Sequence, residues 1–294
     1  MKRMKKNNME LSSYLKEKKR IIDRYLEEKL PLENQNPSIV HRSIRYSVLN
    51  GGKRIRPILT MMVAELLDQD YKKVLPAAAG IELIHTFSLV HDDLPCMDDD
   101  DYRRGKLTNH KVFGEAMAIL TGDALLVMGL DFICRNAQIE GVKKDSVVEV
   151  VQNILEMLGT RKMLGGQVDD ISWHNQKNNA DFIEDIYSRK TSALICASLK
   201  TGALLLQASK KQLEALETYG EKIGLAFQII DDLIDLQEDK EIDDKPTYPV
   251  IFGVKKSEEV ARQYCNQAKE SISLFGGKAQ LFYDLADFVV NRKK

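Results

Sequence analysis

The sequence predicts an all-α protein, and three observations support this prediction. Apolar residues recur every three or four positions along most of the chain, as they do in amphipathic helices. No segment shows the sustained alternation of apolar and polar residues that is typical of a half-buried strand. The 17 Gly and 7 Pro among 294 residues are too few for a loop-dominated chain. We therefore expect one helical domain that spans residues 1–294.

The periodic segments define the expected helices. In residues 10–29, Leu11, Leu15 and Ile22 keep helical spacing, with Lys, Arg and Glu between them. None of the breaks between segments is long enough to be an interdomain linker. We expect roughly ten to thirteen helices, over residues 10–29, 38–50, 57–69, 74–93, 112–140, 146–164, 180–206, 210–237, 257–274 and 277–292.

Composition argues against several classes of protein. The 43 Lys and Arg balance 44 Asp and Glu, so the net charge of −1 gives no general attraction to nucleic acid or anionic lipid. No uncharged apolar stretch approaches the roughly 20 residues of a membrane span, and the basic N-terminal segment, which we interpret as a solvated arm, lacks the apolar region of a secretory signal. The four Cys are too far apart for a CxxC metal site or a disulfide framework. We expect a cytoplasmic protein without a membrane span or a nucleic-acid partner.

Three carboxylates share one face of an otherwise apolar helix in residues 227–236. At 100° per residue, Asp231, Asp232 and Asp235 fall within about a 100° arc together with Gln228, and the rest of the circumference is Phe, Ile and Leu. Buried like charges repel one another, and desolvation raises their pKa values unless cations neutralise them. An exposed acidic face is the ordinary alternative. The apolar flanks favour bound divalent metal ions instead.

A second apolar helix delivers another Asp pair, Asp92 and Asp93, at its C-terminal end. Pro95 ends this helix, so Asp98 must return from a loop to meet Asp92. His85, seven residues before Asp92, shares its helix face. Asp-only ligation suits Mg²⁺ or Mn²⁺ rather than Zn²⁺, and Mg²⁺ usually bridges carboxylates to substrate phosphate. Two Asp-rich faces therefore predict a polyphosphate that is bound through metal ions.

Basic residues gather beside these clusters in the sequence. Lys53, Arg54 and Arg56 follow two glycines, and Arg103 and Arg104 follow the first Asp cluster within a few residues. Arg binds phosphate through two parallel hydrogen bonds, and Lys acts as a point charge. Any one of these residues alone is expected at a solvated surface, whereas the combination predicts phosphate binding.

Six short motifs occur in order along the chain. Residues 51–57 read GGKRIRP, residues 89–101 read LVHDDLPCMDDDD and are followed by RRGK, and residues 122–125 read GDAL. Residues 166–170 read GQVDD, a Lys-Thr pair stands at 190–191, and residues 227–235 read FQIIDDLID. Each motif alone is a weak signal. The ordered set resembles the trans-isoprenyl diphosphate synthases (polyprenyl synthetases), most closely the bacterial farnesyl diphosphate synthases, over nearly the whole chain.

The resemblance implies an isoprenoid-synthase helical bundle around a central cavity, usually homodimeric. It implies that isopentenyl diphosphate condenses with an allylic diphosphate, dimethylallyl or geranyl, to give farnesyl diphosphate through an allylic carbocation. About three Mg²⁺ ions per site, with Mn²⁺ possible, would hold the allylic diphosphate so that its C–O bond ionises. The departing diphosphate would take the proton, since no dedicated base is evident.

The resemblance also implies a role for each matching residue. The metal ligands would be Asp92, Asp98 and Asp231, supported through water or hydrogen bonds by Asp93, Asp170, Asp232 and Asp235. Lys190, counted with the three ligands as catalytic, would bind the allylic diphosphate together with Arg103, Thr191, Gln228 and Lys245. Isopentenyl diphosphate would be bound by Lys53, Arg56, His85 and Arg104. For His85, an ordinary core histidine is the competing interpretation.

Product length depends on the floor of the hydrocarbon pocket. Phe87 lies five residues, about 7.5 Å, before Asp92 on its helix, and with the small Ser88 it resembles the floor of the fifteen-carbon type. Geranylgeranyl or another short-chain diphosphate stays an alternative product, and Phe87 as an ordinary core residue stays the alternative role. The chain departs from the family where residues 237–245 replace a longer loop with a GKxxGxD element.

Other classes fit the sequence less well. A class I terpene cyclase shares the metal chemistry but usually lacks the GGKR and RR elements that bind a second diphosphate. An HD-type phosphohydrolase needs several His ligands, and this chain has five His in all. A non-catalytic Mg²⁺- or Ca²⁺-binding helical protein has no use for the neighbouring cations, and the chain has no EF-hand loop.

Overall fold

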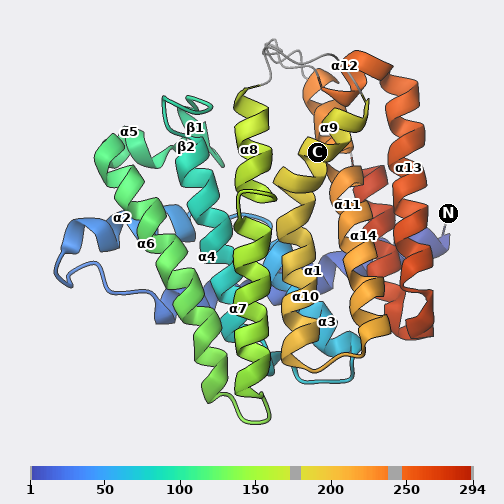
Figure 1. The fold of residues 1–294 in the computed structure, drawn as a ribbon, viewed down its shortest axis with the longest axis horizontal. Helices are drawn as coiled ribbons and strands as arrows, with labels where there is room; N and C mark the ends of the chain where they lie inside the picture. Colours follow the sequence, from blue (N-terminus) through green and yellow to red (C-terminus); the bar gives the residue numbers. More distant parts are fainter. Residues whose placement is uncertain (1, 173–179, 238–246, 293–294) are drawn as a thin grey trace. The chain divides into compact units, whose positions relative to one another are not determined.

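The computed structural model describes residues 2–172, 180–237 and 247–292, and nearly all of them are helical (Figure 1). Within these ranges there are fourteen α-helices, α1 to α14, and only α5 and α12 are as short as five residues. The predicted all-α class is confirmed, and the twelve longer helices fall within the expected number.

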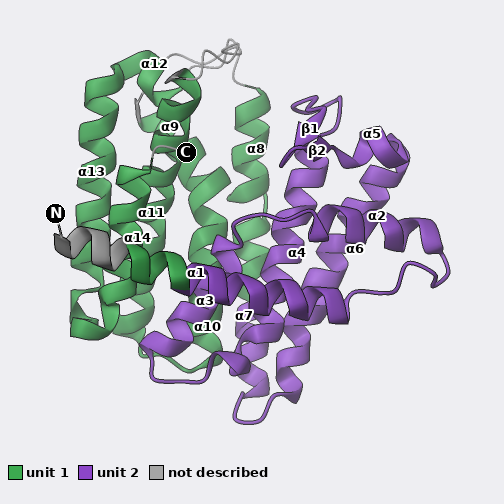
Figure 2. Cartoon of the chain, turned by 180° about the vertical axis from the view of Figure 1, so that it is seen from behind, with its two compact units in different colours: residues 1–13, 152–294 green, residues 14–151 purple. Residues whose placement is uncertain are grey.

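The chain divides into two compact units (Figure 2). Unit 1 consists of Met1–Ser13 and Gln152–Lys294, and unit 2 of Tyr14–Val151. The boundaries fall within two helices, α1 (Lys2–Lys29) and α7 (Lys144–Leu158). The expected single domain over residues 1–294 stays a prediction.

Unit 2 is organised around the packing of α4 against α6. Glycines make this contact close, because a Cβ at Gly80 on α4 would lie 2.5 Å from the carbonyl oxygen of Gly129 on α6. Ile81, Ile84 and Phe132 are fully buried around it. The remaining elements of unit 2 are α2 (Ser38–Leu49), α3 (Ile55–Leu66), η1 (Tyr71–Lys73), α4 (Leu75–Asp92), β1 (Tyr102–Arg103), β2 (Lys106–Leu107), α5 (Asn109–Phe113), α6 (Glu115–Cys134) and η2 (Arg135–Gln138).

A small β-hairpin is the feature of unit 2 that the sequence did not predict. Tyr102–Arg103 pairs antiparallel with Lys106–Leu107, and the two turn residues, Arg104 and Gly105, both have positive φ. Such a turn matches the natural twist of a hairpin. Two residues per strand are too few for alternation to be visible in the sequence. The expected helix 112–140 is likewise interrupted, at Gly114, where φ is 85°.

Unit 1 is organised around α11, which packs against α10, α13 and α14. The apolar side of α11 contributes Ile229, Ile230 and Leu233 to a core that also contains Ile183 and Tyr248. The expected helix 180–206 contains a π-helical turn, η4 (Ser188–Ser192), of a kind often found at functional sites. The elements of unit 1 after α7 are α8 (Met163–Ile171), α9 (Ala180–Tyr187), η4, α10 (Ala193–Leu205), α11 (Lys210–Gln237), α12 (Tyr248–Phe252), α13 (Val254–Ser271), η5 (Ser273–Ala279) and α14 (Gln280–Asn291).

One helical stretch among the described residues, Glu115–Gln138, is long and apolar enough to cross a membrane by length and composition, with a mean hydropathy of 1.8. It was not expected, because Asp123 and Asp131 interrupt its apolar residues. Only 39% of its most apolar window is buried within the chain. A single such helix is weak evidence for a membrane span, and its exposed apolar side needs another explanation.

Candidate active site

The first Asp cluster lies where α4 ends. The backbone N–H of Asp98 donates to the carbonyl oxygen of Asp92 over 2.9 Å, and that of Asp99 donates to Leu94 over 3.1 Å. The chain therefore turns back directly after the helix, as the position of Pro95 predicts. This return brings Asp98 beside Asp92 in unit 2.

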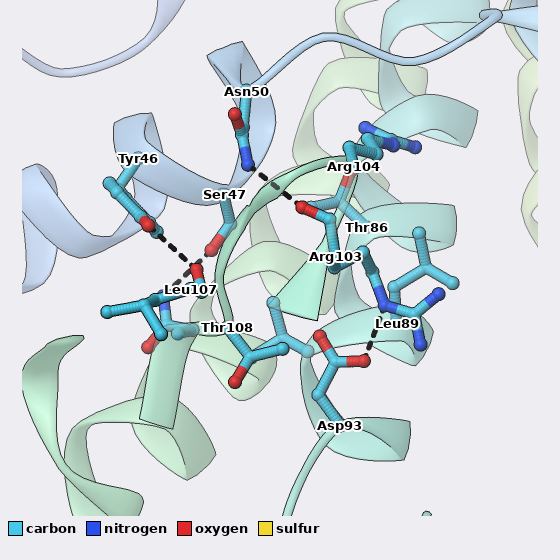
Figure 3. Close-up of a pocket in the computed structure, with 12 residues that line it drawn as sticks. Tyr46, Ser47, Asn50, Thr86, Leu89, Asp93, Arg103, Arg104, Leu107 and Thr108 are labelled. Atoms are coloured by element: carbon cyan, nitrogen blue, oxygen red, sulfur yellow. Dashed lines mark hydrogen bonds and ion pairs between the residues drawn. The ribbon is translucent and has the colours of Figure 1, made fainter. Parts of the chain in front are cut away.

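Asp93 points inward rather than toward solvent, and it is 3% exposed. Burial raises the pKa of Asp93, although the guanidinium of Arg103 opposes this shift. Arg103 donates to Asp93 through Nε (Figure 3). It also donates to Asp100 through Nη2 over 2.8 Å. Arg103 thus fixes the hairpin to the end of α4. If Arg103 also binds an allylic diphosphate as predicted, its guanidinium would contact two carboxylates and the diphosphate.

The glycine turn and Arg104 lie against each other. Arg104 donates through Nη1 to the carbonyl oxygen of Gly51, and a Cβ at Gly52 would lie 2.6 Å from the Cζ atom of Arg104. Gly52 has a φ of 117°, which favours glycine on its own account. Gly52 of the GGKRIRP motif therefore makes room for the guanidinium of Arg104, which follows the first Asp cluster.

Arg56 and His85 also come together, as the resemblance implies. The Nη1 atom of Arg56 lies 3.2 Å from Nε2 of His85. Because a guanidinium only donates, Nε2 accepts and the imidazole is neutral. Burial, followed by the charges of Arg56 and Arg104, lowers the pKa of His85 well below its ordinary value. With the exposed Lys53 next to this turn, unit 2 contains every residue predicted to bind isopentenyl diphosphate.

The neutral His85 predicts a pH dependence of stability. Below pH 6.5 the unfolded chain binds a proton at His85 that the folded chain does not, so the free energy of unfolding falls as the pH falls. The slope contributed by one such proton reaches about 1.4 kcal/mol per pH unit well below pH 6.5. We expect His85→Gln to remove this part of the difference between urea denaturation at pH 5.5 and pH 7.5. An unchanged difference would contradict a depressed pKa at His85.

Arg54 turns away from the other cations of its motif. Its side chain is 1% exposed and donates to Glu82 over 2.6 Å, to Asp23 over 2.8 Å and to the carbonyl oxygen of Val48 over 2.6 Å. The sequence grouped Arg54 with Lys53 and Arg56 beside the turn, but the structure makes it the buried anchor of that turn. Glu82 lies on α4 three residues before His85, so the anchor joins the turn to the helix that carries His85.

A pocket opens beside these groups in unit 2 (Figure 3). It has about 360 Å³ of empty space, part of it open to solvent. Asp93, Arg103 and Arg104 line it together with Asn50 and Thr108. Its polar lining includes two of the arginines that the sequence assigned to diphosphate binding.

The second Asp cluster lies on α11 in unit 1. Asp231 has a side-chain exposure of 37%, Asp232 is 8% exposed, and Asp235 is exposed. The Thr191 hydroxyl donates to the side-chain oxygen Oε1 of Gln228 over 2.8 Å, and the side-chain Nε2 of Gln228 donates to Asp232 over 3.1 Å. The Lys-Thr pair and the FQIIDDLID motif are thereby joined, as expected of one site.

Asp232 is the most strongly perturbed carboxyl of this cluster. Burial raises its pKa to about 6, although hydrogen bonds from Tyr187 and Gln228 act in the opposite direction. The raised pKa shows that the ionised carboxylate is disfavoured by its surroundings, and positive charge nearby would stabilise it. Bound cations would therefore stabilise the carboxylates of this cluster, as the sequence predicts.

The GQVDD motif meets the Lys-Thr pair through an ion pair. Lys190 Nζ lies 2.6 Å from a carboxylate oxygen of Asp170, and both side chains are partly buried. Lys190 lies in the π-helical turn η4 and Asp170 in α8. Because Lys190 and Thr191 are consecutive residues of η4, Lys190 lies beside the Thr191 that contacts Gln228 of the second Asp cluster.

These motifs have known counterparts. The family model for polyprenyl synthetases matches residues 37–274. The chain belongs to the polyprenyl synthetase family.

Its relatives make products of different length. It is 41% identical to a geranylgeranyl diphosphate synthase of Cyanophora paradoxa, covering 97% of each chain. It is 36% identical to the farnesyl diphosphate synthase of Bacillus subtilis, covering 96% of this chain and 98% of the other. A solved FPP/GFPP synthase from Zymomonas mobilis has a TM-score of 0.88 at 33% identity, covering 96% of this chain and 99% of that one. The comparisons support trans-prenyltransferase activity and leave the product open between farnesyl and geranylgeranyl diphosphate.

Sequence reasoning missed two groups of residues in this polyprenyl synthetase. The hydroxyl of Tyr187 donates to Asp232 and accepts from the backbone N–H of Tyr248 over 3.2 Å. Its position three residues before Lys190, one helical turn away, was the available signal. The second group is Asp99, Asp101 and His110, whose ligand atoms lie within 4.8 Å of one another. Nothing in the spacing of these three residues distinguishes them from other acidic neighbours.

Two predicted features of the polyprenyl synthetase lie outside the described residues. Lys245 falls in residues 238–246, as does nearly all of the shortened loop 237–245. The role of Lys245 at the allylic diphosphate stays a prediction.

Proposed function

We propose that this polyprenyl synthetase condenses isopentenyl diphosphate with dimethylallyl or geranyl diphosphate to give farnesyl diphosphate. One observation carries the proposal. In unit 2, Arg56 contacts neutral His85 on α4, the helix that ends in Asp92, and the cation of Arg104 lies against the glycine turn that precedes Arg56. Such cationic residues suit a diphosphate bound directly, whereas paired carboxylates suit one bound through metal ions. Unit 2 thus has one group of residues suited to bind a diphosphate directly and another suited to bind a diphosphate through metal ions. Condensation of two substrates requires two diphosphate sites, whereas cyclisation of one substrate requires a single site.

The residues fit a divalent cation. The first cluster offers carboxylates that the turn after α4 brings together, and the second offers carboxylates and an amide on one face of α11. All-oxygen donors of this kind suit Mg²⁺, with Mn²⁺ as the alternative. We assign Asp92, Asp98 and Asp231 as ligands of about three Mg²⁺ ions. When bound, Mg²⁺ would act as a Lewis acid toward the allylic diphosphate.

The residues of the chain would then bind and orient the substrates. Lys190 and Thr191 would bind the allylic diphosphate as negative charge builds up on it, which favours loss of the C–O bonding pair to oxygen. Lys53, Arg56 and Arg104 would hold isopentenyl diphosphate so that its double bond attacks the allylic cation. The new C–C bond takes the electron pair of that double bond, and the adjacent proton passes to the released diphosphate.

An assay with defined substrates tests the proposal. The enzyme is incubated with Mg²⁺, isopentenyl diphosphate and either dimethylallyl or geranyl diphosphate, and the products are separated by chromatography. We expect a longer prenyl diphosphate that requires both substrates. A cyclic hydrocarbon or a free alcohol formed without isopentenyl diphosphate would instead indicate a cyclase or a hydrolase.

Farnesyl diphosphate is favoured over geranylgeranyl diphosphate by the position of Phe87. Phe87 lies on α4 five residues before Asp92, is 8% exposed, and packs edge-on against His91 with ring centroids 5.1 Å apart. A ring fixed in this way would stop a growing chain before it passes along α4. The identity to geranylgeranyl diphosphate synthases is the observation that favours the longer product.

Replacing the aromatic ring tests this assignment. We expect Phe87→Ala to shift the product distribution toward twenty carbons or more, because the ring no longer limits the chain. Ser88→Ala, which changes the neighbouring residue without adding space of that size, is the control and should keep the parent product. The measurement is chromatography of the dephosphorylated products. An unchanged distribution in Phe87→Ala would remove Phe87 from this role.

We further propose a cytoplasmic homodimer. All four cysteines are free thiols, which a reducing compartment preserves. On α6, Ile119, Leu120 and Val127 are 45%, 55% and 67% exposed. An apolar helix that is largely uncovered within its own chain suits an interface with a second copy.

A charge on this face should separate the copies. We expect Val127→Asp to convert a dimer to a monomer in light scattering after size-exclusion chromatography, because an unpaired charge would be desolvated in the interface. Leu274→Glu, on a 40% exposed leucine in η5, is the matched control and should leave the mass unchanged. A monomeric parent protein would contradict the proposal.

A further inference from the structure

A buried arginine beyond the end of α14 contacts the second Asp cluster. The Nη2 atom of Arg292 donates to Oδ1 of Asp231 and, over 3.0 Å, to the carbonyl oxygen of Phe227. Its guanidinium also lies over the Phe227 ring, 3.9 Å from the centroid. All three contacts are made to one turn of α11, and one of them is to the carboxylate that the proposed function assigns to a metal ion.

The burial of Arg292 is unusual for a charged side chain. Its side chain is 3% exposed, and its Nε has no hydrogen-bond partner among the residues that the structure describes. Taking a charge out of water is costly unless it is paired. The pairing with Asp231 therefore supplies the negative charge that compensates the buried guanidinium.

We propose that Arg292 is the internal cation of the second Asp cluster: it occupies Asp231 in the metal-free enzyme, and a divalent cation must displace it. The inference rests on the proposed function, which makes Asp231 a metal ligand. A guanidinium and a divalent ion on the same carboxylate oxygen repel each other at short range. Each therefore weakens the binding of the other, and Arg292 sets how readily the cluster takes up metal before substrate is present.

The local structure allows this exchange without disturbing the core. Phe282, Leu285 and Val289 bury α14 in unit 1, and the hydroxyl of Tyr219 donates to the carbonyl oxygen of Phe282 over 2.8 Å. The helix ends at Asn291, and Arg292 itself has extended backbone angles, φ −67° and ψ 142°. Release of the arginine thus needs movement only beyond the last helical residue.

Metal titration of the full-length enzyme without substrate tests the inference. Calorimetry with Mn²⁺ compares the parent protein, Arg292→Gln and the matched control Arg262→Gln, which removes an exposed arginine from α13. If Arg292 occupies Asp231 about nine-tenths of the time, its removal should tighten binding about tenfold. Arg262→Gln should leave the affinity unchanged. Arg292→Lys, which keeps the charge but not the forked geometry, should fall between the parent and Arg292→Gln.

A second measurement follows the arginine itself. Trypsin can cleave after Arg292 only when this side chain has left its buried site, and intact mass reports the loss of the last two residues. We expect Mn²⁺ to accelerate this cleavage in the parent enzyme. Asp231→Asn should be cleaved rapidly without metal, since the pairing is gone. Cleavage that does not respond to either change would overturn the inference.

The outcomes separate this inference from the proposed function. An Arg292→Gln affinity equal to or weaker than that of the parent, in an enzyme that still makes prenyl diphosphates, would refute the displacement and leave the function intact. Tighter metal binding in a protein that makes no prenyl diphosphate would support the displacement and refute the function.

Discussion

Asp231→Asn should lower kcat by about a thousandfold, equivalent to about 4 kcal/mol of transition-state stabilisation. Asn has the shape of Asp but no charge, so the expected loss of kcat comes from weaker metal binding, while the ion pair between Asp231 and Arg292 is lost as well. Asp231 is also partly exposed, with a side-chain exposure of 37%, so its replacement leaves no buried cavity. Steady-state kinetics at saturating substrate, repeated over a range of Mg²⁺ concentrations, measures the effect.

The control for this prediction is a charge change of the same kind elsewhere. Asp145→Asn replaces an exposed carboxylate in the first turn of α7 and should keep kcat within about twofold of the parent. Parent-like thermal unfolding of Asp231→Asn would show that the fold is retained. A loss of only tenfold at any Mg²⁺ concentration would mean that Asp231 supports a metal site without being a ligand.

The sequence predicted best what depends on neighbours along the chain. The helix expected over residues 210–237 was correct and begins at Lys210 as expected; Ile229, Ile230 and Leu233 mark its buried side by their spacing. The return of Asp98 to Asp92 was also correct, since Pro95 cannot continue the helix. Both inferences use steric rules that act within a few residues.

Contacts between distant residues were beyond that reasoning. Arg54 and Glu82 are 28 positions apart, and Arg292 and Asp231 are 61 positions apart. Which way an arginine turns depends on what packs around it, and an arginine in a basic motif has the same local pattern whether it faces solvent or a buried carboxylate. The sequence thus identified the charged residues of the candidate site without distinguishing the buried anchor, Arg54, from the cations that we propose to bind phosphate.

That anchor leads to the largest expected effect on stability. Glu82→Gln should lower the free energy of unfolding by about 3 kcal/mol, because it leaves the guanidinium of Arg54 buried with one carboxylate fewer. Both side chains are 1% exposed, and Glu82 is held 2.6 Å from Arg54. Urea denaturation at neutral pH measures the loss. Asp287→Asn, which breaks a half-exposed pair with Lys269, should cost less than about 1 kcal/mol.

A double variant distinguishes a buried charge from a general loss of packing. Replacing both partners, Arg54→Met with Glu82→Met, removes the uncompensated charge and should be less destabilised than Glu82→Gln alone. Glu82→Gln and the double variant also test whether the Arg54–Glu82 pair supports substrate binding, since Arg54 joins the glycine turn to α4 next to Arg56 and His85. Loss of the anchor should raise KM for isopentenyl diphosphate more than it lowers kcat, because the turn orients the groups that bind this substrate. If the double variant were less stable than both the parent and Glu82→Gln, the contribution of Arg54 to stability would come from packing and not from its charge.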